Sequence, residues 1–417
     1  MTSLAYGALW VFVFSVPWER IIVLPGISIV SRATGTVALG LALLAVVTSA
    51  RVRRLHGFHA AALLFVIACG AGLVGVRMKQ IPDKFLTYVQ LLLMVWIIWE
   101  LAPSRQRLSG LLTAYVFGAY VAAFNTLLLY RGASGRVNRF AAGEADPNDH
   151  AMTLALGLPM AWHLGNTCRR PLLRWVYRAY LPVAIMAIGL TGSRGGMLAS
   201  MVALLIVPLT VAKLSPARLA TAIMILGLSG AVAVTYVPDR LVKRFASTGS
   251  DVQDLRFGGR FKLWMAGARA FSEKPLMGYG TSGFIRAIDT RLGVYAQVAH
   301  NSFLSVLVEQ GIVGFLPFAM MFIAVYLAVM KLPTMDRRFG LVLLATLVIA
   351  MLPLSWENRK AGWFVLAALI GLARAERPGP GGVVRRGQAR RFAPRERLPL
   401  ATPPFHPLAT PGGNATP

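Results

Sequence analysis

Long apolar runs alternate with short clusters of Lys and Arg along most of this chain. In lipid, every backbone polar group has to be satisfied within the protein, so only α-helices and closed β-barrels span a membrane. The sequence lacks the alternating ten-residue segments that are typical of barrel strands. It therefore predicts an all-α, polytopic membrane protein.

We expect about twelve membrane-spanning helices, since each needs roughly 20 mostly apolar residues, or fewer where the bilayer adapts. They are residues 4–18, 33–50, 57–76, 84–101, 109–130, 149–165, 176–192, 195–212, 217–236, 312–330, 339–355 and 361–374. The first run lacks a basic leader and a cleavage site, so we interpret it as a retained helix and not as a signal peptide. Residues 20–32 are expected to lie at the membrane interface.

The predicted domain boundary follows the last span. Residues 1–376 form one transmembrane domain, which includes a long loop at 237–300 between spans nine and ten. Residues 377–417 are rich in Pro, Gly and Arg and are predicted to be a disordered basic tail.

Composition supports a membrane protein over a nucleic-acid-binding one. Charged residues make up only 14% of the chain, whereas about a quarter is usual for soluble proteins. A net charge of +27 would suggest nucleic acid for a soluble domain, but basic cytoplasmic loops explain it here. We therefore expect membrane lipids, and no nucleic acid, as partners.

Cysteine and metal-site patterns are sparse. Cys69 lies in an apolar run and Cys168 in a basic loop, so no disulfide between them is expected. The sequence has no CxxC, HExxH or paired-carboxylate motif, and Asp251 and Asp254 are best explained as a solvated turn. No metal or cofactor is predicted.

An even number of spans places both termini on one side. With both termini in the cytoplasm, the inner loops hold 14 Lys or Arg, the five short outer loops hold 11, and the tail adds eight to the inner side. Because Lys and Arg favour cytoplasmic loops, this orientation is the predicted one.

The long outer loop departs from that trend. Residues 237–300 carry ten basic and five acidic side chains. Positive charge kept outside suggests an anionic ligand, although a solvated loop is the plainer interpretation. Within the loop, 260–270 is predicted to be a helix and 278–280 a turn, and a helix over 300–310 is expected to stop at Gly311.

A second outer feature is the short turn TGSRGG at 191–196. It holds Arg194 near membrane depth, where an ionisable residue is a functional candidate; the alternative is an arginine that only extends to the interface. The glycines would allow a ligand to approach the backbone closely. In the preceding outer segment, Asn148 or Asp149 is expected to cap the following helix.

Three segments occur in order: TGSRGGMLA at 191–199, GRFKLW at 259–264 and HNSFLSVLVEQGIVG at 300–314. Together they resemble the O-antigen ligase and polymerase superfamily of bacterial inner-membrane glycosyltransferases, and the lipopolysaccharide O-antigen ligases most of all. That family carries His, then Asn, Ser or Gln, then nine residues, Gly, two residues and a small or aromatic residue, a pattern that His300-Asn301, Gly311 and Gly314 fit. The resemblance covers about residues 140–365, and the first spans match only in hydropathy.

The resemblance implies a GT-C-like fold with a helical periplasmic loop. It also implies a metal-independent, inverting transfer of polysaccharide from undecaprenyl diphosphate to a sugar hydroxyl of the lipid A core, on the periplasmic face. These two lipids are then the expected partners. Residue by residue, it carries over Arg194, Arg260 and His300 as site residues.

Those residue types suit the chemistry. A guanidinium binds phosphate through paired hydrogen bonds, so Arg194 and Arg260 are expected to hold the diphosphate, with Arg256 adding a contact from the same helical face. A neutral imidazole accepts a hydroxyl proton, and nearby arginines favour the neutral form. His300 is therefore expected to be the general base or, alternatively, the group that orients the acceptor.

Asn301 and Tyr279 are expected to support the site. Asn301 would orient the imidazole or the sugar, and Tyr279, between two glycines, would stack on a sugar ring or serve only in packing. Glu309 is expected to end a helix. Lipid substrates should approach through a lateral cleft near Arg194.

Two alternative functions remain open. A polysaccharide polymerase of the same superfamily would extend the lipid-linked glycan and ignore lipid A core. A transporter of lipid-linked oligosaccharides would need charged or broken helices near mid-membrane, and the sequence shows few intramembrane ionisable residues.

Overall fold

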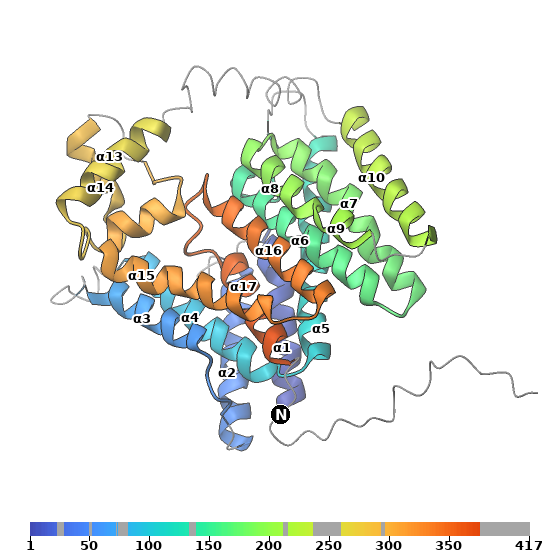
Figure 1. Ribbon diagram of the computed structural model, residues 1–417, viewed down its shortest axis with the longest axis horizontal. Coiled ribbons are helices and arrows are strands. Elements are labelled where there is room, and N and C mark those ends of the chain that lie inside the picture. The colour runs from blue at the N-terminus through green and yellow to red at the C-terminus, as the bar shows by residue number, and fades with distance from the viewer. Residues whose placement is uncertain are drawn as a thin grey trace, which may run out of the picture. The chain divides into compact units, whose positions relative to one another are not determined.

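The computed structural model describes residues 1–22, 29–49, 52–71, 73, 82–132, 139–211, 216–236, 260–292 and 297–375. Within these ranges every regular element is a helix and no strand is present (Figure 1). All of the helices belong to one compact unit, Met1–Arg377. The all-α prediction is therefore confirmed, while the predicted disordered tail lies outside the described residues.

The helices follow the predicted apolar runs. They are α1 Thr2–Ser15 with the 3₁₀ turn Val16–Trp18, α2 Val30–Ser49, α3 Gly57–Ala71, α4 Asp83–Leu101, α5 Arg105–Gly132, α6 Pro147–Thr167, α7 Pro171–Thr191, α8 Arg194–Leu204, α9 Ile206–Val211, α10 Pro216–Tyr236, α13 Arg260–Glu273, α14 Phe284–Leu292, α15 Ser302–Met330, α16 Thr334–Met351 and α17 Lys360–Ala375. The run predicted at 195–212 is divided between α8 and α9.

Five of the described helices are long and apolar enough to cross a membrane. They are α2, α4, α5, α7 and α15. Shorter apolar helices cover Thr2–Trp18, Gly57–Ala71 and Arg194–Thr210. The prediction of twelve spans is thus supported for five helices and stays a prediction for the others.

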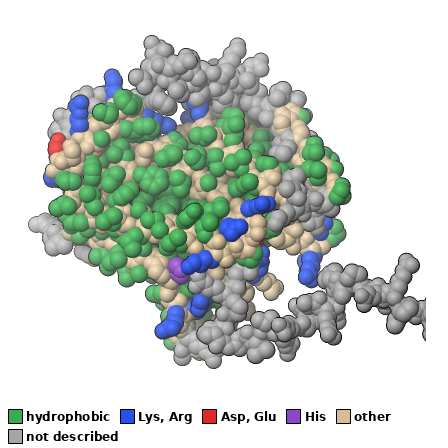
Figure 2. Space-filling view, viewed as in Figure 1, with side chains coloured by type: hydrophobic (Ala, Val, Ile, Leu, Met, Phe, Trp, Pro, Cys, Tyr) green, Lys and Arg blue, Asp and Glu red, His purple; other side chains and the backbone are tan. Residues whose placement is uncertain are grey.

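Large apolar side chains remain on the outside of the helices. On α15 the exposed side chains include Leu316, Met320, Ile323 and Leu327, whose spacing of three and four residues places them on one helical face. Figure 2 shows apolar side chains over a broad area of one face, with Lys and Arg mostly near its margins. An exposed apolar surface of this extent is what a lipid-facing protein presents, and the chain is a multi-pass membrane protein.

Helix ends follow local capping signals. The side chain of Asp146 accepts hydrogen bonds from the backbone N–H groups of Asn148 and Asp149, at 2.8 and 3.2 Å. Asp146 is therefore the cap of α6, and the prediction that Asn148 or Asp149 caps this helix was wrong. At the other turn, α7 ends at Gly192 with φ +60°, and Ser193 caps α8 by accepting from the Gly196 N–H at 3.1 Å.

The glycines after Arg194 serve helix packing. A Cβ on Gly196 would lie 2.3 Å from the Cβ of Ala151 on α6, and one on Gly195 would lie 2.9 Å from Met152 and 3.0 Å from Pro353. Small residues let helices approach closely in membranes. We expected these glycines to admit a ligand, but α6 and Pro353 occupy that space.

The helices α13 and α14 form a small core of their own against the first part of α15 (Figure 1). Its buried side chains are Leu263, Ala266, Ala270, Phe284, Ala287, Ile288, Ala299 and Val308. The predicted helix at 260–270 is confirmed within α13. This packing attaches the long loop to the membrane helices instead of leaving it as an extended loop.

The long helix α15 is broken at Gly311, as predicted. Gly311 has φ +61° and ψ −165°, and a Cβ there would lie 2.2 Å from the carbonyl oxygen of Leu276. The amides of Ile312 and Val313 donate to the carbonyls of Pro275 and Leu276, at 2.8 and 3.1 Å. A neighbouring turn thus satisfies the backbone groups that the break releases, which is the condition for an interrupted helix in a membrane protein.

Candidate functional site

His300 stands immediately before α15 in a strained backbone conformation. Its φ is +47°, in the left-handed region that non-glycine residues rarely adopt. The next residue, Asn301, caps the helix, because its side-chain oxygen accepts from the Leu304 N–H at 3.0 Å. The side chain of Asn301 therefore caps α15. This cap fixes the backbone directly after His300.

The motif GRFKLW places Arg260 beside His300. Arg260 and Trp264 are four residues apart and lie on the same side of α13. The indole N–H of Trp264 donates to the carbonyl of Ala299 at 3.0 Å, next to the histidine. The tryptophan therefore fastens the segment before His300 to the helix that carries the arginine.

The electrostatic surroundings of His300 favour its neutral form. Burial lowers the pKa of His300 below its usual value, and the positive charge of Arg260 lowers it further. The carboxylates of Asp146 and Asp149 act in the opposite direction on the same pKa, but they do not outweigh these two causes. The prediction that a nearby arginine keeps the imidazole neutral is consistent with this arrangement.

The acidic start of α6 therefore faces the histidine. Asp149 accepts a hydrogen bond from the indole N–H of Trp356 at 2.9 Å and forms a salt bridge with Arg359. Sequence reasoning missed Trp356 and Arg359, which follow α16 in the chain. Their signal was a run of polar and aromatic residues, WENRK at 356–360, between two apolar segments.

The segment 352–359 ties the parts of the site together. The hydroxyl of Ser302 donates to the carbonyl of Leu354 at 2.8 Å and accepts from the backbone N–H of Trp356 at 2.7 Å. Because Pro353 in the same segment lies against Gly195, the turn that carries Arg194 is joined to the start of α15.

Arg194 is the first residue of α8 and is partly buried. Arg139 braces its turn, donating to the carbonyl of Thr191 and to the side-chain oxygen of Asn148, both at 2.8 Å. The segment 352–359 thus links the turn of Arg194 to the start of α15, which follows His300. Arg260, in contrast, lowers the pKa of the His300 imidazole directly through its charge.

Two further predicted residues have different outcomes. Arg256 lies outside the described residues. Tyr279 is engaged within the protein: its hydroxyl donates to Glu273 at 2.9 Å, and the ammonium of Lys274 lies 4.6 Å from its ring centroid. Its backbone N–H donates to the carbonyl of Val308 at 2.9 Å, so Tyr279 also supports the break in α15.

A buried charge cluster lies behind the site. Lys84 on α4 contacts Glu309 at 2.9 Å and Glu357 at 2.6 Å, and Ser305 donates to the same oxygen of Glu357 at 2.8 Å. We expected Glu309 to end a helix. An ionisable cluster among membrane helices was also not expected, because Lys84 lies more than 200 residues from both glutamates in the chain.

Two other histidines that the structure describes are engaged with other side chains. His150 is buried, with Nε2 at 2.8 Å from the hydroxyl of Thr126. His163 is buried and stacks on Phe339. Among the described residues, no group of three or more His, Cys, Asp or Glu is placed to hold a metal ion. Both cysteines are free.

A small polar cavity of about 60 Å³ lies at the start of α6 and α17. Its charged lining residues are Glu19, Arg20, Asp149, Arg359 and Lys360. The position of Asp149 on this cavity and near His300 makes the cavity part of the candidate site.

The comparison with protein families finds one match. A family model described as O-antigen ligase matches residues 179–319. The matched residues contain Arg194, Arg260 and His300, but neither the start of α6 nor the segment 352–359. No curated protein matches the chain at a significant level.

Proposed function

Because a family model described as O-antigen ligase matches residues 179–319, we propose that this membrane protein is a glycosyltransferase. In this proposal it transfers a polysaccharide from undecaprenyl diphosphate to a sugar hydroxyl of the lipid A core. The protein would lie in the bacterial inner membrane with both termini in the cytoplasm and its site on the periplasmic face.

The observation that carries the proposal is that Arg260 lies close enough to His300 to lower its pKa. A base for a sugar hydroxyl has to be neutral at physiological pH, and burial together with Arg260 keeps the pKa of His300 low. The same arginine offers a permanent positive charge for a phosphate. One residue pair thus provides both functions that the transfer requires.

In the proposed reaction, the acceptor oxygen attacks the anomeric carbon as His300 takes its proton. The bond from that carbon to the diphosphate oxygen breaks, and the electron pair leaves with the diphosphate. Attack from the face opposite the leaving group inverts the anomeric centre. Arg260 and Arg194 would stabilise the charge that develops on the phosphate oxygens.

Other residues would position these groups. Trp264 holds the chain at Ala299, and Asn301 sets the start of α15. Asp149 holds Arg359 at the edge of the polar cavity, where Arg359 would meet a phosphate or a sugar. The arginines would take the place that a metal ion holds in many glycosyltransferases, so the transfer is proposed to need no metal.

The test is a reconstituted transfer with purified protein, a defined lipid-linked glycan and lipid A core. We expect His300→Ala and Arg260→Ala to lose most of the transfer, whereas Arg269→Ala should keep it. Arg269 lies on the same helix as Arg260 but is exposed. Full activity of His300→Ala protein would refute the assignment of the base.

The product distinguishes the ligase from a polymerase. A ligase joins glycan to lipid A core, whereas a polymerase produces longer lipid-linked glycan and ignores the core. Movement of the lipid-linked substrate across vesicles without a covalent product would instead support a transporter.

A further inference from the structure

A cavity of about 630 Å³ lies between α2 and α4, with α1 as its floor. We call it the α2–α4 groove. Its lining residues come from α2 and α4, together with Phe12 on α1 and Lys360 on α17. Arg194 is not among them, so this groove is not the lateral cleft that we expected near that arginine.

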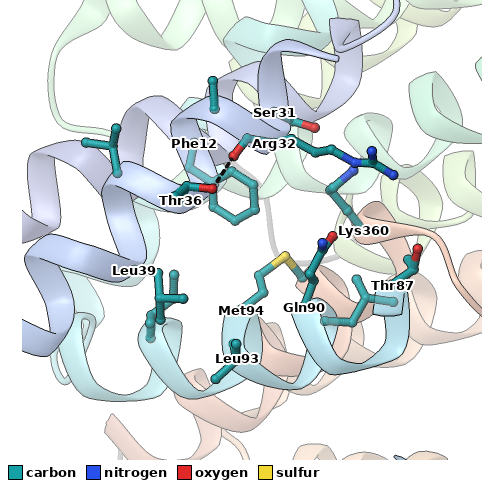
Figure 3. Close-up of a pocket in the computed structure, with 15 residues that line it drawn as sticks. Phe12, Ser31, Arg32, Thr36, Leu39, Thr87, Gln90, Leu93, Met94 and Lys360 are labelled. Atoms are coloured by element: carbon teal, nitrogen blue, oxygen red, sulfur yellow. Dashed lines mark hydrogen bonds between the residues drawn. The ribbon is translucent and has the colours of Figure 1, made fainter. Parts of the chain in front are cut away.

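The groove has a polar end and an apolar end. Figure 3 shows Ser31, Arg32, Thr87 and Lys360 gathered at one end, with Leu39 and Leu93 toward the other. The polar lining residues come early in α2 and in α4, and the larger apolar ones come later in each helix. Such a site matches an amphiphile that has an anionic head and a hydrocarbon tail.

The groove opens sideways between the two helices. Val37 on α2 and Leu93 on α4 both line it, yet their side chains are 57% and 36% exposed at the protein surface. Within the part of the chain that the structure describes, no other segment covers these two side chains, so a hydrocarbon chain in the bilayer can enter between the helices without crossing water. A volume near 630 Å³ lies within the roughly 300–1,000 Å³ of sites that hold one small molecule.

Lys360 connects the groove to the candidate site. It lines both the α2–α4 groove and the small polar cavity that contains Asp149 and Arg359. Its ammonium lies 2.9 Å from Glu19, which also accepts a hydrogen bond from Ser31 in the groove. The positive end of the groove is therefore adjacent to the residues that face His300.

We propose that the α2–α4 groove binds the hydrocarbon tail of the lipid-diphosphate donor and delivers its head to the site through Lys360. This inference rests on the proposed function. A carrier with a single tail fits one groove between two helices, whereas a lipid with several acyl chains needs a wider surface. The diphosphate complements the charge of Arg32 and Lys360, and an anion there would compete with Glu19 for the lysine.

The experiment measures binding of undecaprenyl diphosphate, without a glycan, to purified protein in detergent. Thr36→Trp and Leu93→Trp place an indole in the groove and should weaken binding by about tenfold or more, since an occupied site cannot hold the tail. The matched controls are Leu43→Trp on α2 and Leu86→Trp on α4, which are exposed and do not line the groove. These controls should bind like the unaltered protein.

The head of the carrier gives a second measurement. Lys360→Gln should weaken binding of undecaprenyl diphosphate by about tenfold, and Lys360→Arg should restore most of it, because a charge-assisted hydrogen bond to phosphate is lost and regained. The groove variants should leave binding of inorganic diphosphate unchanged, since that probe has no tail. Equal binding by the groove variants and their controls would overturn the proposal.

Two further outcomes keep this inference distinct from the proposed function. If no acceptor yields a product but the groove variants still lose undecaprenyl diphosphate, the groove stands and the glycosyltransferase proposal fails. If transfer occurs and the groove variants keep the donor KM, the groove proposal fails alone. Loss of lipid A binding without loss of undecaprenyl diphosphate would assign the groove to the acceptor and overturn it.

Discussion

Replacing Lys84 by methionine tests whether the buried charge cluster holds the site together. The side chain of Lys84 is 16% exposed, and those of Glu309 and Glu357 are 4% and 0% exposed. The methionine would fill a similar volume but leave two buried carboxylates without their cation. Because water barely reaches these groups, the lost attraction is not recovered by hydration.

The expected magnitude follows from this burial. Removing one partner of a buried ion pair usually costs about 3–5 kcal/mol, because the remaining charge is left uncompensated. Here one lysine serves two carboxylates, so we expect Lys84→Met to reach the upper part of that range. Glu309→Gln leaves the pair of Lys84 and Glu357 intact and keeps an oxygen that accepts from the lysine. It should therefore cost only about 1 kcal/mol.

The assay is the free energy of unfolding in mixed detergent micelles, measured for both variants and for Lys262→Met. Lys262 lies on α13 with an exposed side chain, so its replacement should change stability by less than about 0.5 kcal/mol. Adding Glu357→Gln to Lys84→Met should restore part of the loss, since one unpaired carboxylate is removed. The reasoning is refuted if Lys84→Met destabilises the protein no more than Glu309→Gln.

The remaining predictions concern the site directly. Arg260→Gln should raise the pKa of His300, because it removes a positive neighbour. The acid limb of the kcat/KM profile should then move to higher pH by about one unit or less. Arg260→Lys keeps the charge and should leave that limb in place. Trp264→Phe should lower kcat by about tenfold at unchanged donor KM, because the hydrogen bond to Ala299 is lost; a change confined to KM would contradict a positioning role. Gly311→Ala should lower the free energy of unfolding by more than about 2 kcal/mol, because φ is positive there and Leu276 occupies the place of the Cβ. Gly40→Ala has open space at its Cβ and should be neutral or stabilising in the same unfolding assay. Transfer rates should be the same with and without a chelator, and a chelator-sensitive rate that added Mg²⁺ restores would refute the metal-independent proposal.

Local patterns in the sequence were sufficient to predict most of the helices and to single out candidate site residues. Hydrophobic runs, caps and glycines act over a few residues, so the break at Gly311 and the helix containing Arg260 could be predicted. The order of motifs made His300 a candidate and gave the resemblance to the O-antigen ligases, which the comparison with families supports over residues 179–319.

Partnerships between distant segments needed the tertiary structure. Asp149 was expected to cap a helix but pairs with Arg359, and Glu309 was expected to end one but pairs with Lys84. In each pair the two residues lie more than 200 positions apart, and neither has a sequence pattern that names its partner.

The sequence by itself determined that this chain forms apolar helices and that ten basic side chains lie in the segment 237–300, which ends at His300. Only the tertiary structure decided which charges neutralise one another and that Lys360 joins an apolar groove to the site. The physical reason is range: hydrophobicity and capping are properties of neighbouring residues, whereas an ion pair or a groove exists only once packed helices bring distant side chains within a few ångströms.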